Sequence, residues 1–396
     1  MNMNEQMKES EESILHTYNR FPVVFEKGQG CYLYDSEGKE YLDFAAGIAV
    51  NALGYHYPGY DEALKSQIDK LMHISNLYYN EPIIEAGAKL VKASKMSKAF
   101  FTNSGTEAIE GALKAAKKYA YVRDGHADHE IIAMNHSFHG RSIGALSVTG
   151  TAHYREPFEP LMGGVKFADF NNLESVKAQI TDKTCAIITE VVQGEGGIYP
   201  AKKEFLEGLR QICDEKDIML IFDEIQCGMG RTGHYFAWQA YGVQPDIMTS
   251  AKALGCGVPV GAFVLNEKAA KASLEPGDHG TTYGGNPFVC AAVSKVFDIY
   301  ENDKIIEHVQ EMTPYLEQKL DEIVAKHECA ATRRGMGFMQ GIVIQGRPVG
   351  EVVKAALAKG LLVISAGSDV LRIVPPLVIT KEHIDKMAAI LDECME

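Results

Sequence analysis

Short apolar runs that end in polar or glycine-rich turns recur through the middle of the chain. Such runs are typical of buried strands. Helical patterns separate several of them, and in the segment after Gly105 the apolar positions between 108 and 116 fall on one helix face. This alternation predicts an α/β fold built on a mainly parallel sheet. The predicted strands are KAFFT (98–102), EIIAMN (130–135), TCAIITEVV (184–192), IMLIFDE (218–224), DIMTSAK (246–252) and GAFVL (261–265).

The pattern changes after about residue 296. An amphipathic helix over 306–323 is followed by the strand-like GFMQGIVI, a helix near 349–359, and the strand-like LLVISA and VLRIVPP. Near the N-terminus, CYLYD and EYLDF have the pattern of a hairpin around residues 36–38. We therefore expect a large domain over 61–295 and a smaller α+β domain formed by 1–60 plus 296–396.

Composition and charge narrow the classes of function. The 396 residues are 46% hydrophobic and 23% charged, which is ordinary for a globular chain long enough for more than one core. With 39 Lys and Arg against 53 Asp and Glu, the net charge of −14 argues against nucleic acid or an anionic membrane as a partner. An anionic substrate must then be held by individual arginines.

Cysteine usage and the N-terminal sequence bear on location. The eight cysteines include no CxxC pair that would suit zinc, an iron–sulfur cluster or thiol redox work, so a reduced setting fits best. The first residues, MNMNEQMKESEES, are polar and acidic, and no apolar stretch approaches the length of a membrane span. We expect a cytoplasmic protein without a signal peptide or transmembrane helix.

Two polar segments follow predicted strands at positions suited to ligand binding. Residues 103–106 lie between a strand and a helix, where backbone N–H groups and the helix dipole can bind a phosphate ester. The same segment also fits a plain helix N-cap at Ser104 or Thr106. Asp223 and Glu224 end IMLIFDE, which places a carboxylate at the mouth of a buried strand.

Three further patterns resemble known ligand sites, and we reject each. The only Gly-Lys pair, at 38–39, lacks the following Ser or Thr and the upstream glycine of a phosphate-binding loop. GMGRTG (228–233) matches the dinucleotide-binding pattern, but it is detached from its strand and lacks the downstream acidic residue. The histidine pairs at 126/129 and 136/139 have metal-ligand spacing without a suitable Cys or Glu, so we expect hydrogen-bonded or surface histidines and no metal.

Lys252 ends the run PDIMTSAK and precedes the flexible turn ALGCGVPVG. Most lysines are solvated, but desolvation at the end of an apolar strand lowers the pKa of an amine and favours imine formation with an aldehyde. Asp223 lies 29 residues earlier, at the end of another predicted strand. Pyridoxal 5'-phosphate requires an imine-forming amine, a carboxylate that keeps its pyridine nitrogen protonated, and an anion pocket.

The sequence also resembles a known family over nearly its whole length. The matching segments include RFPVV, YLDFAAGIAVNALG, FFTNSGTEA, HSFHGR, EVVQGEGGI, DEIQCGMGRTG, AKALGCGVP, GDHGTTYGGNP and VLRIVPPLVIT, in the family's order and spacing. The family is the subgroup III (ω-amino acid) aminotransferases, and the resemblance is greatest to its members that use N-acetylornithine. It implies the fold-type I architecture of pyridoxal-phosphate-dependent transferases, and transfer of the δ-amino group of N2-acetyl-L-ornithine to 2-oxoglutarate in arginine biosynthesis. It also implies a homodimer with shared active sites.

The resemblance also implies roles for individual residues. Lys252 would bind the cofactor and carry a proton, and Asp223 would pair with its ring nitrogen. Arg141 would face the distal carboxylate of both substrates, whereas Arg372 would bind the α-carboxylate of glutamate and pair with Glu195 when acetylornithine is bound. The other implied contacts are Gly105 and Thr106 for the phosphate, Phe138 and Ile225 for the ring faces, Gln226 for the phenolic oxygen, Glu224 for the cofactor, Thr282 for the phosphate of the neighbouring subunit, and Tyr18 and Thr281 for the substrate.

The chain departs from the family pattern without losing a catalytic group. GYHYP (54–58) stands where relatives usually read Gly-His-x-His-Pro, and Cys227 and Cys256 replace a usual threonine and a usual glycine. Lys252 does not separate the possible activities within the family, because all of them use this lysine. They are the aminotransferases of ornithine, 4-aminobutyrate, succinylornithine and acetyl-lysine, and the aminomutase of glutamate semialdehyde. A binding protein on a retired scaffold would be expected to lose Lys252 or Asp223, and both are present.

Overall fold

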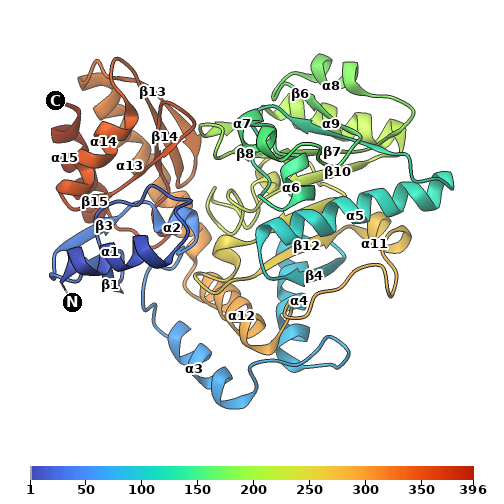
Figure 1. The fold of residues 1–396 in the computed structure, drawn as a ribbon, viewed down its shortest axis with the longest axis horizontal. Coiled ribbons are helices and arrows are strands. Elements are labelled where there is room, and N and C mark those ends of the chain that lie inside the picture. Colours follow the sequence, from blue (N-terminus) through green and yellow to red (C-terminus); the bar gives the residue numbers. More distant parts are fainter. Residues whose placement is uncertain (1) are drawn as a thin grey trace.

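The computed structural model describes residues 2–396. A seven-stranded sheet with helices on both faces forms the larger part of the molecule, and two four-stranded sheets belong to a second part that contains both chain ends (Figure 1). In spatial order the large sheet consists of β4 (Lys98–Thr102), β12 (Gly261–Leu265), β11 (Ile247–Ser250), β10 (Met219–Asp223), β7 (Thr184–Glu190), β5 (Glu130–Met134) and β6 (Val165–Ala168).

The helices connect and cover these sheets. They are α1 (Met3–Ser13), α2 (Ala46–Ala49), α3 (Tyr60–Lys70), α4 (Glu81–Ser94), α5 (Gly105–Asp124), α6 (Ile143–Ser147), α7 (Ala152–Arg155), α8 (Leu173–Gln179), α9 (Lys203–Lys216), α10 (Trp238–Tyr241), α11 (Glu267–Ala272), α12 (Pro287–Asn302), α13 (Ile305–Lys326), α14 (Val349–Ala358) and α15 (Lys381–Met395). No helix within residues 2–396 is both long enough and apolar enough to cross a membrane.

The large sheet is parallel except for β12, which runs antiparallel to both β4 and β11. Every residue of β7, β10, β11 and β12 is buried, as expected when helices cover both faces. Successive side chains point to opposite faces, so Ile131 and Ile221 pack in the core that contains α5, while Ile132 and Leu220 pack in the core that contains α9 and α12. The carboxyl ends of the parallel strands meet at one edge, where ligands bind in such sheets.

The second part combines both ends of the chain. One of its sheets consists of β1 (Phe25–Gln29), β2 (Tyr32–Asp35), β3 (Glu40–Asp43) and β15 (Leu361–Leu362), and the other of β13 (Ala330–Met336), β14 (Met339–Ile344), β17 (Val370–Ile373) and β16 (Ile364–Ala366). A separate pair is formed by β8 (Val192–Gln193) and β9 (Tyr199–Pro200). β3 pairs in parallel with β15, with Leu42 opposite Leu361. The hairpin between β2 and β3 confirms the predicted turn around residues 36–38.

The six predicted strands of the large sheet are confirmed, with shifts of one or two residues at six of their twelve ends. LLVISA was wrongly predicted as one strand, because it divides into β15 and β16, which belong to different sheets. β6 and β13 were not predicted, since VKFA is short and AATRRGM is too polar to form an apolar run. The domain limit at 295/296 stays a prediction, and it falls inside α12.

Candidate active site

A cavity of about 560 Å³ opens at the carboxyl edge of the large sheet. Its walls come from the segments that follow β4, β5, β7, β10 and β11, together with Tyr18 and Val50 from the N-terminal part. The predicted site residues that line it are Tyr18, Gly105, Thr106, Phe138, Arg141, Glu195, Asp223, Ile225, Gln226 and Lys252. The topology therefore brings together residues that lie up to 234 positions apart, from Tyr18 to Lys252.

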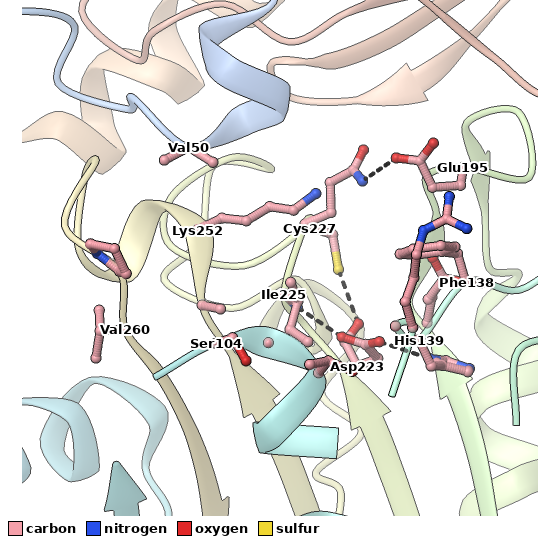
Figure 2. A pocket seen from close by; sticks show the side chains of 18 of the residues that line it. Val50, Ser104, Phe138, His139, Glu195, Asp223, Ile225, Cys227, Lys252 and Val260 are labelled. Atoms are coloured by element: carbon pink, nitrogen blue, oxygen red, sulfur yellow. Dashed lines mark hydrogen bonds and ion pairs between the residues drawn. The ribbon is translucent and has the colours of Figure 1, made fainter. Parts of the chain in front are cut away.

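Lys252 begins the short 3₁₀ turn η2 (Lys252–Leu254) after β11. Its φ of 49° lies in the left-handed region, which is uncommon for a residue with a Cβ and is often found at functional sites. Figure 2 shows the half-buried side chain extended into the cavity. Burial lowers the pKa of the Lys252 amine to about 8, although attraction to Glu195 acts in the opposite direction. A neutral, nucleophilic amine is therefore available near neutral pH.

Asp223 is the last residue of β10 and is only 4% exposed. Its Oδ2 accepts a hydrogen bond from His139 Nδ1 at 2.7 Å when His139 carries its proton there. Its Oδ1 accepts from the Ile225 backbone N–H at 3.0 Å and from Thr249 Oγ1 at 3.1 Å. These donors fix the orientation of a carboxylate that lines the cavity.

Phe138 and Ile225 lie on opposite sides of the space next to Asp223 (Figure 2). Gly105 lies close behind Ile225, since a Cβ at position 105 would be 2.9 Å from Ile225 Cδ1 and 3.4 Å from Ala251 Cβ. Only glycine lets the start of α5 approach this closely. The two apolar side chains form a slot suited to a flat aromatic ring, with a carboxylate at its edge.

The start of α5 provides an anion site at the same cavity. Ser104 is the N-cap, and its side chain accepts from Glu107 N at 3.3 Å, which confirms the plain capping role for that residue. The first N–H groups of a helix have no partner within the helix, and Gly105 and Thr106 line the cavity. The Thr106 and Ser142 hydroxyls lie 2.8 Å apart. This polar end, the slot, the carboxylate and the free amine match the phosphate, ring, ring nitrogen and aldehyde of pyridoxal phosphate.

Arg372 on β17 forms an ion pair with Glu195 through both of its Nη atoms, with Nη2 3.2 Å from Oε2. Arg372 Nη1 also donates to Gln226 Oε1 at 3.1 Å, and Gln226 Nε2 donates to Glu195 Oε1 at 3.3 Å. The Arg372 and Glu195 side chains are 4% and 26% exposed. Burial acts to raise the pKa of Glu195, but Arg372, Lys252 and Gln226 together outweigh it and the net shift is downward.

Arg141 lies over two aromatic rings, with its guanidinium carbon 5.6 Å from the centre of Phe138 and 4.6 Å from that of Tyr154. A guanidinium stacked in this way keeps its N–H groups free for a carboxylate. Thr281 lies outside the cavity wall, where its Oγ1 accepts from Asn103 Nδ2 at 3.0 Å. Thr282, the next residue, is exposed.

Glu224 does not line the cavity, which argues against the expected cofactor contact. Its carboxylate accepts from the backbone N–H groups of Ala237 and Trp238, both at 2.8 Å, and from the Cys227 thiol. Burial raises the pKa of Glu224 to about 7. The side chain turns away because the loop after β10 needs an acceptor for these donors, so Glu224 orders the loop behind the site.

The two histidine pairs are engaged differently from metal ligands. His139 bonds to Asp223, whereas His136 is exposed. Near the end of α5, His129 Nε2 donates to Asp124 at 2.9 Å, and the ring of His126 stacks on that of His129 at 4.6 Å. These three residues are close enough to share an ion, but the Asp124 carboxylate is already held on both oxygens by Arg123.

The sequence analysis does not predict two buried residues of the site, His139 and Glu190. Glu190 ends TCAIITE as Asp223 ends IMLIFD, so a carboxylate at the end of a buried strand was an available signal. His139 stands in the segment HSFHGR and was read only for its spacing from His136. No local pattern indicates that it pairs with Asp223, 84 residues away.

Comparison with known proteins agrees with this geometry. The sequence profile of the class-III aminotransferases matches residues 14–395. The chain is 47% identical to an acetylornithine aminotransferase of Clostridium acetobutylicum, over 98% of this chain and 100% of that protein. It is 44% identical to a succinylornithine transaminase of Yersinia pseudotuberculosis, over 94% and 92%. Its structure is similar to that of the Toxoplasma gondii ornithine aminotransferase, which holds pyridoxal phosphate at partial occupancy, with a TM-score of 0.95 and 28% identity over 100% of this chain and 94% of that one.

Proposed function

The chain belongs to the class-III aminotransferase family, and on that premise we propose that it transfers the δ-amino group of N2-acetyl-L-ornithine to 2-oxoglutarate. The products are N-acetyl-L-glutamate 5-semialdehyde and L-glutamate, and the cofactor is pyridoxal 5'-phosphate. The observation that carries this proposal is the ion pair of buried Arg372 with half-buried Glu195 beside Lys252, because two unlike substrates must use one site.

The chain's residues suit the cofactor as follows. Gly105 and Thr106 would hold the phosphate, Phe138 and Ile225 would enclose the ring, and Asp223 would keep the ring nitrogen protonated. When bound, the cofactor supplies an electron-accepting ring that stabilises negative charge on the substrate carbon. Lys252 Nζ, as a neutral amine, would take the proton from that carbon and return it elsewhere. Gln226, which is already bonded to Glu195, would donate to the phenolic oxygen of the cofactor.

Substrate positioning follows from the two arginines. Glutamate carries a carboxylate next to its reacting amine, whereas acetylornithine carries an aliphatic chain there. Arg372 would bind that carboxylate of glutamate, and would return to Glu195 when acetylornithine occupies the same space, since an unpaired buried cation is costly. Arg141 would bind the carboxylate at the far end of either substrate. Tyr18, which lines the cavity, would contact the substrate, whereas the contact of Thr281 stays a prediction because Thr281 lies behind Asn103 and outside the cavity wall.

The assembly we propose rests on exposed side chains, and the location rests on the state of the cysteines. Thr282 and Tyr283 are exposed, and the segment 68–84 exposes several large apolar side chains. A second copy of the chain would cover this surface in a homodimer, with Thr282 reaching the phosphate of the neighbouring site. All eight cysteines are free, which suits a cytoplasmic protein. Sedimentation of the purified protein as a monomer at micromolar concentration would contradict the dimer.

A substrate panel tests the function. Purified protein with pyridoxal phosphate and 2-oxoglutarate should form glutamate fastest, by kcat/KM, from N2-acetylornithine. The alternative donors are succinylornithine, acetyl-lysine, ornithine and 4-aminobutyrate, and similarity to the Yersinia protein makes succinylornithine the nearest of them. Acetylation removes a positive charge next to the carboxylate that Arg141 would bind, so free ornithine should be a poorer donor. A clear preference for 4-aminobutyrate would overturn the proposal, and Lys252→Ala serves as the inactive control.

A further inference from the structure

Glu190 is a buried carboxyl group with no role in the scheme above. It ends β7, is 5% exposed and lines the active-site cavity. In the parallel pairing of β7 with β10 it stands opposite Asp223, so the two carboxyl groups lie side by side on the same face of the sheet. Burial, reinforced by the Asp223 carboxylate, raises the pKa of Glu190 well above its ordinary value. Glu190 therefore holds a proton more readily than an ordinary carboxyl group, beside the carboxylate that would serve the cofactor.

The two oxygens of Glu190 hold two different loops. Oε2 accepts from the backbone N–H of Phe138 at 3.3 Å, and Oε1 accepts from the backbone N–H of Gly194 at 3.2 Å. The first loop carries Phe138, the wall of the slot, and Arg141 three residues later. The second carries Glu195, the partner of Arg372, as the residue next to Gly194.

We propose that Glu190 is a positioning residue that sets the distance between the Phe138–Arg141 loop and Glu195, and so holds Glu195 in the arrangement that pairs with Arg372. This inference rests on the proposed function, since it concerns how that site exchanges substrates. Loss of the bond at Gly194 would loosen Glu195 and make the pair with Arg372 less populated. With acetylornithine bound, Arg372 is then more often an unpaired buried cation beside the aliphatic chain, so this half-reaction suffers more than the half-reaction with glutamate, whose carboxylate pairs with Arg372 instead.

Glu190→Gln tests the proposal with little change in shape. Glutamine keeps the length of the side chain, but it offers one acceptor and one NH₂ group where two N–H donors converge, so one backbone donor loses its partner. We expect the acetylornithine half-reaction to fall about tenfold more than the glutamate half-reaction, in proportion to one lost hydrogen bond. Glu190→Asp, whose shorter side chain cannot reach both loops, should shift the ratio in the same direction.

Glu110→Gln is the matched control. Glu110 accepts from Ser142 Oγ and from the backbone N–H groups of Gly144 and Ala145, so it anchors the far end of the Phe138–Arg141 loop without contacting Gly194. Its replacement should change both half-reactions by the same factor. If Glu110→Gln also slowed the acetylornithine half-reaction more than the glutamate half-reaction, any loosening of this loop would have that effect. This result would overturn the role of Glu190.

Hydrogen exchange of the cofactor-free protein gives a second readout that does not depend on turnover. In Glu190→Gln, peptides covering 136–141 and 193–197 should exchange faster together, while the strands of the large sheet keep their protection. Unchanged exchange in both segments, or equal losses in the two half-reactions, would refute the proposal. Failure of both Glu190 variants to fold would also refute it, because the contact is proposed to order loops rather than the sheet. If the protein instead takes the amino group from another donor, the exchange result still stands and only the choice of half-reactions changes.

Discussion

Replacement of Arg372 by alanine should damage the two half-reactions very unequally. Arg372 is 4% exposed as a side chain and is held by Glu195, Gln226 and the Ser365 carbonyl. Truncating one partner of a desolvated charge pair costs about 2–5 kcal/mol. In the glutamate half-reaction the lost partner is the one that binds the substrate, so a middle value of about 3 kcal/mol corresponds to a loss of about 10²-fold in kcat/KM.

In the acetylornithine half-reaction, the cost of removing Arg372 is nearly the same before and after the substrate binds, so it largely cancels. Glu195 is left without Arg372 both before and after this substrate binds, so the variant loses little that is specific to the reaction, and we expect a loss below about tenfold. Stopped-flow measurement of each half-reaction, with acetylornithine or glutamate supplied alone to the protein loaded with pyridoxal phosphate, separates the two effects. Arg334→Ala is a suitable control, since Arg334 Nε donates to Gly197 O at 2.6 Å near the same loop but does not line the cavity. Equal losses in both half-reactions for Arg372→Ala would refute the exchange of partners.

Three further outcomes are expected. Asp223→Asn should still bind pyridoxal phosphate but lose several orders of magnitude in rate, because a neutral ring is a poor electron acceptor, and near-normal turnover would contradict its role. Since burial holds the pKa of Lys252 at about 8, covalent capture of the cofactor by the cofactor-free protein, measured by borohydride trapping, should accelerate up to about pH 8 and then level off. A capture rate still rising at pH 10 would argue for an ordinary solvated lysine, and Lys252→Ala should give no adduct. Cys227, which lines the cavity and whose pKa burial raises, should be alkylated slowly, and more slowly with cofactor than without, whereas equal rates would place it away from the cofactor.

The parts of the site that the sequence predicts are those set by a single strand and the turn after it. Asp223 and Lys252 each end an apolar run, and the N-cap at Ser104 follows from the strand-to-helix transition, so local pattern was enough. The Glu195–Arg372 pair was expected only from the resemblance, because its partners lie 177 residues apart, Glu195 in the turn between β8 and β9 and Arg372 on β17. The orientation of Glu224 could not be predicted, since its acceptor role is created by the N–H groups of a loop that approaches only in the folded chain.

The contacts of Glu190 could not be predicted from the sequence either. The sequence shows that Glu190 ends a strand. The two backbone N–H groups that donate to its carboxyl group, however, belong to loops after different strands. Backbone N–H groups have no sequence signature, so the contact appears only in three dimensions. The division of LLVISA has a similar cause, since the two strands differ in partner rather than in apolar character.

The pairing of β3 with β15 has a consequence for the chain during synthesis. Leu42 cannot meet Leu361 until the ribosome has added the 319 residues that separate them (361 − 42). At about 5–20 residues per second this takes roughly 16–64 s. During that time the apolar Leu42 and Phe44, fully buried in the finished protein, have no permanent cover. Chaperones or fast elongation would limit this exposure, and a stalled or truncated product would leave the edge of β3 that pairs with β15 without its partner.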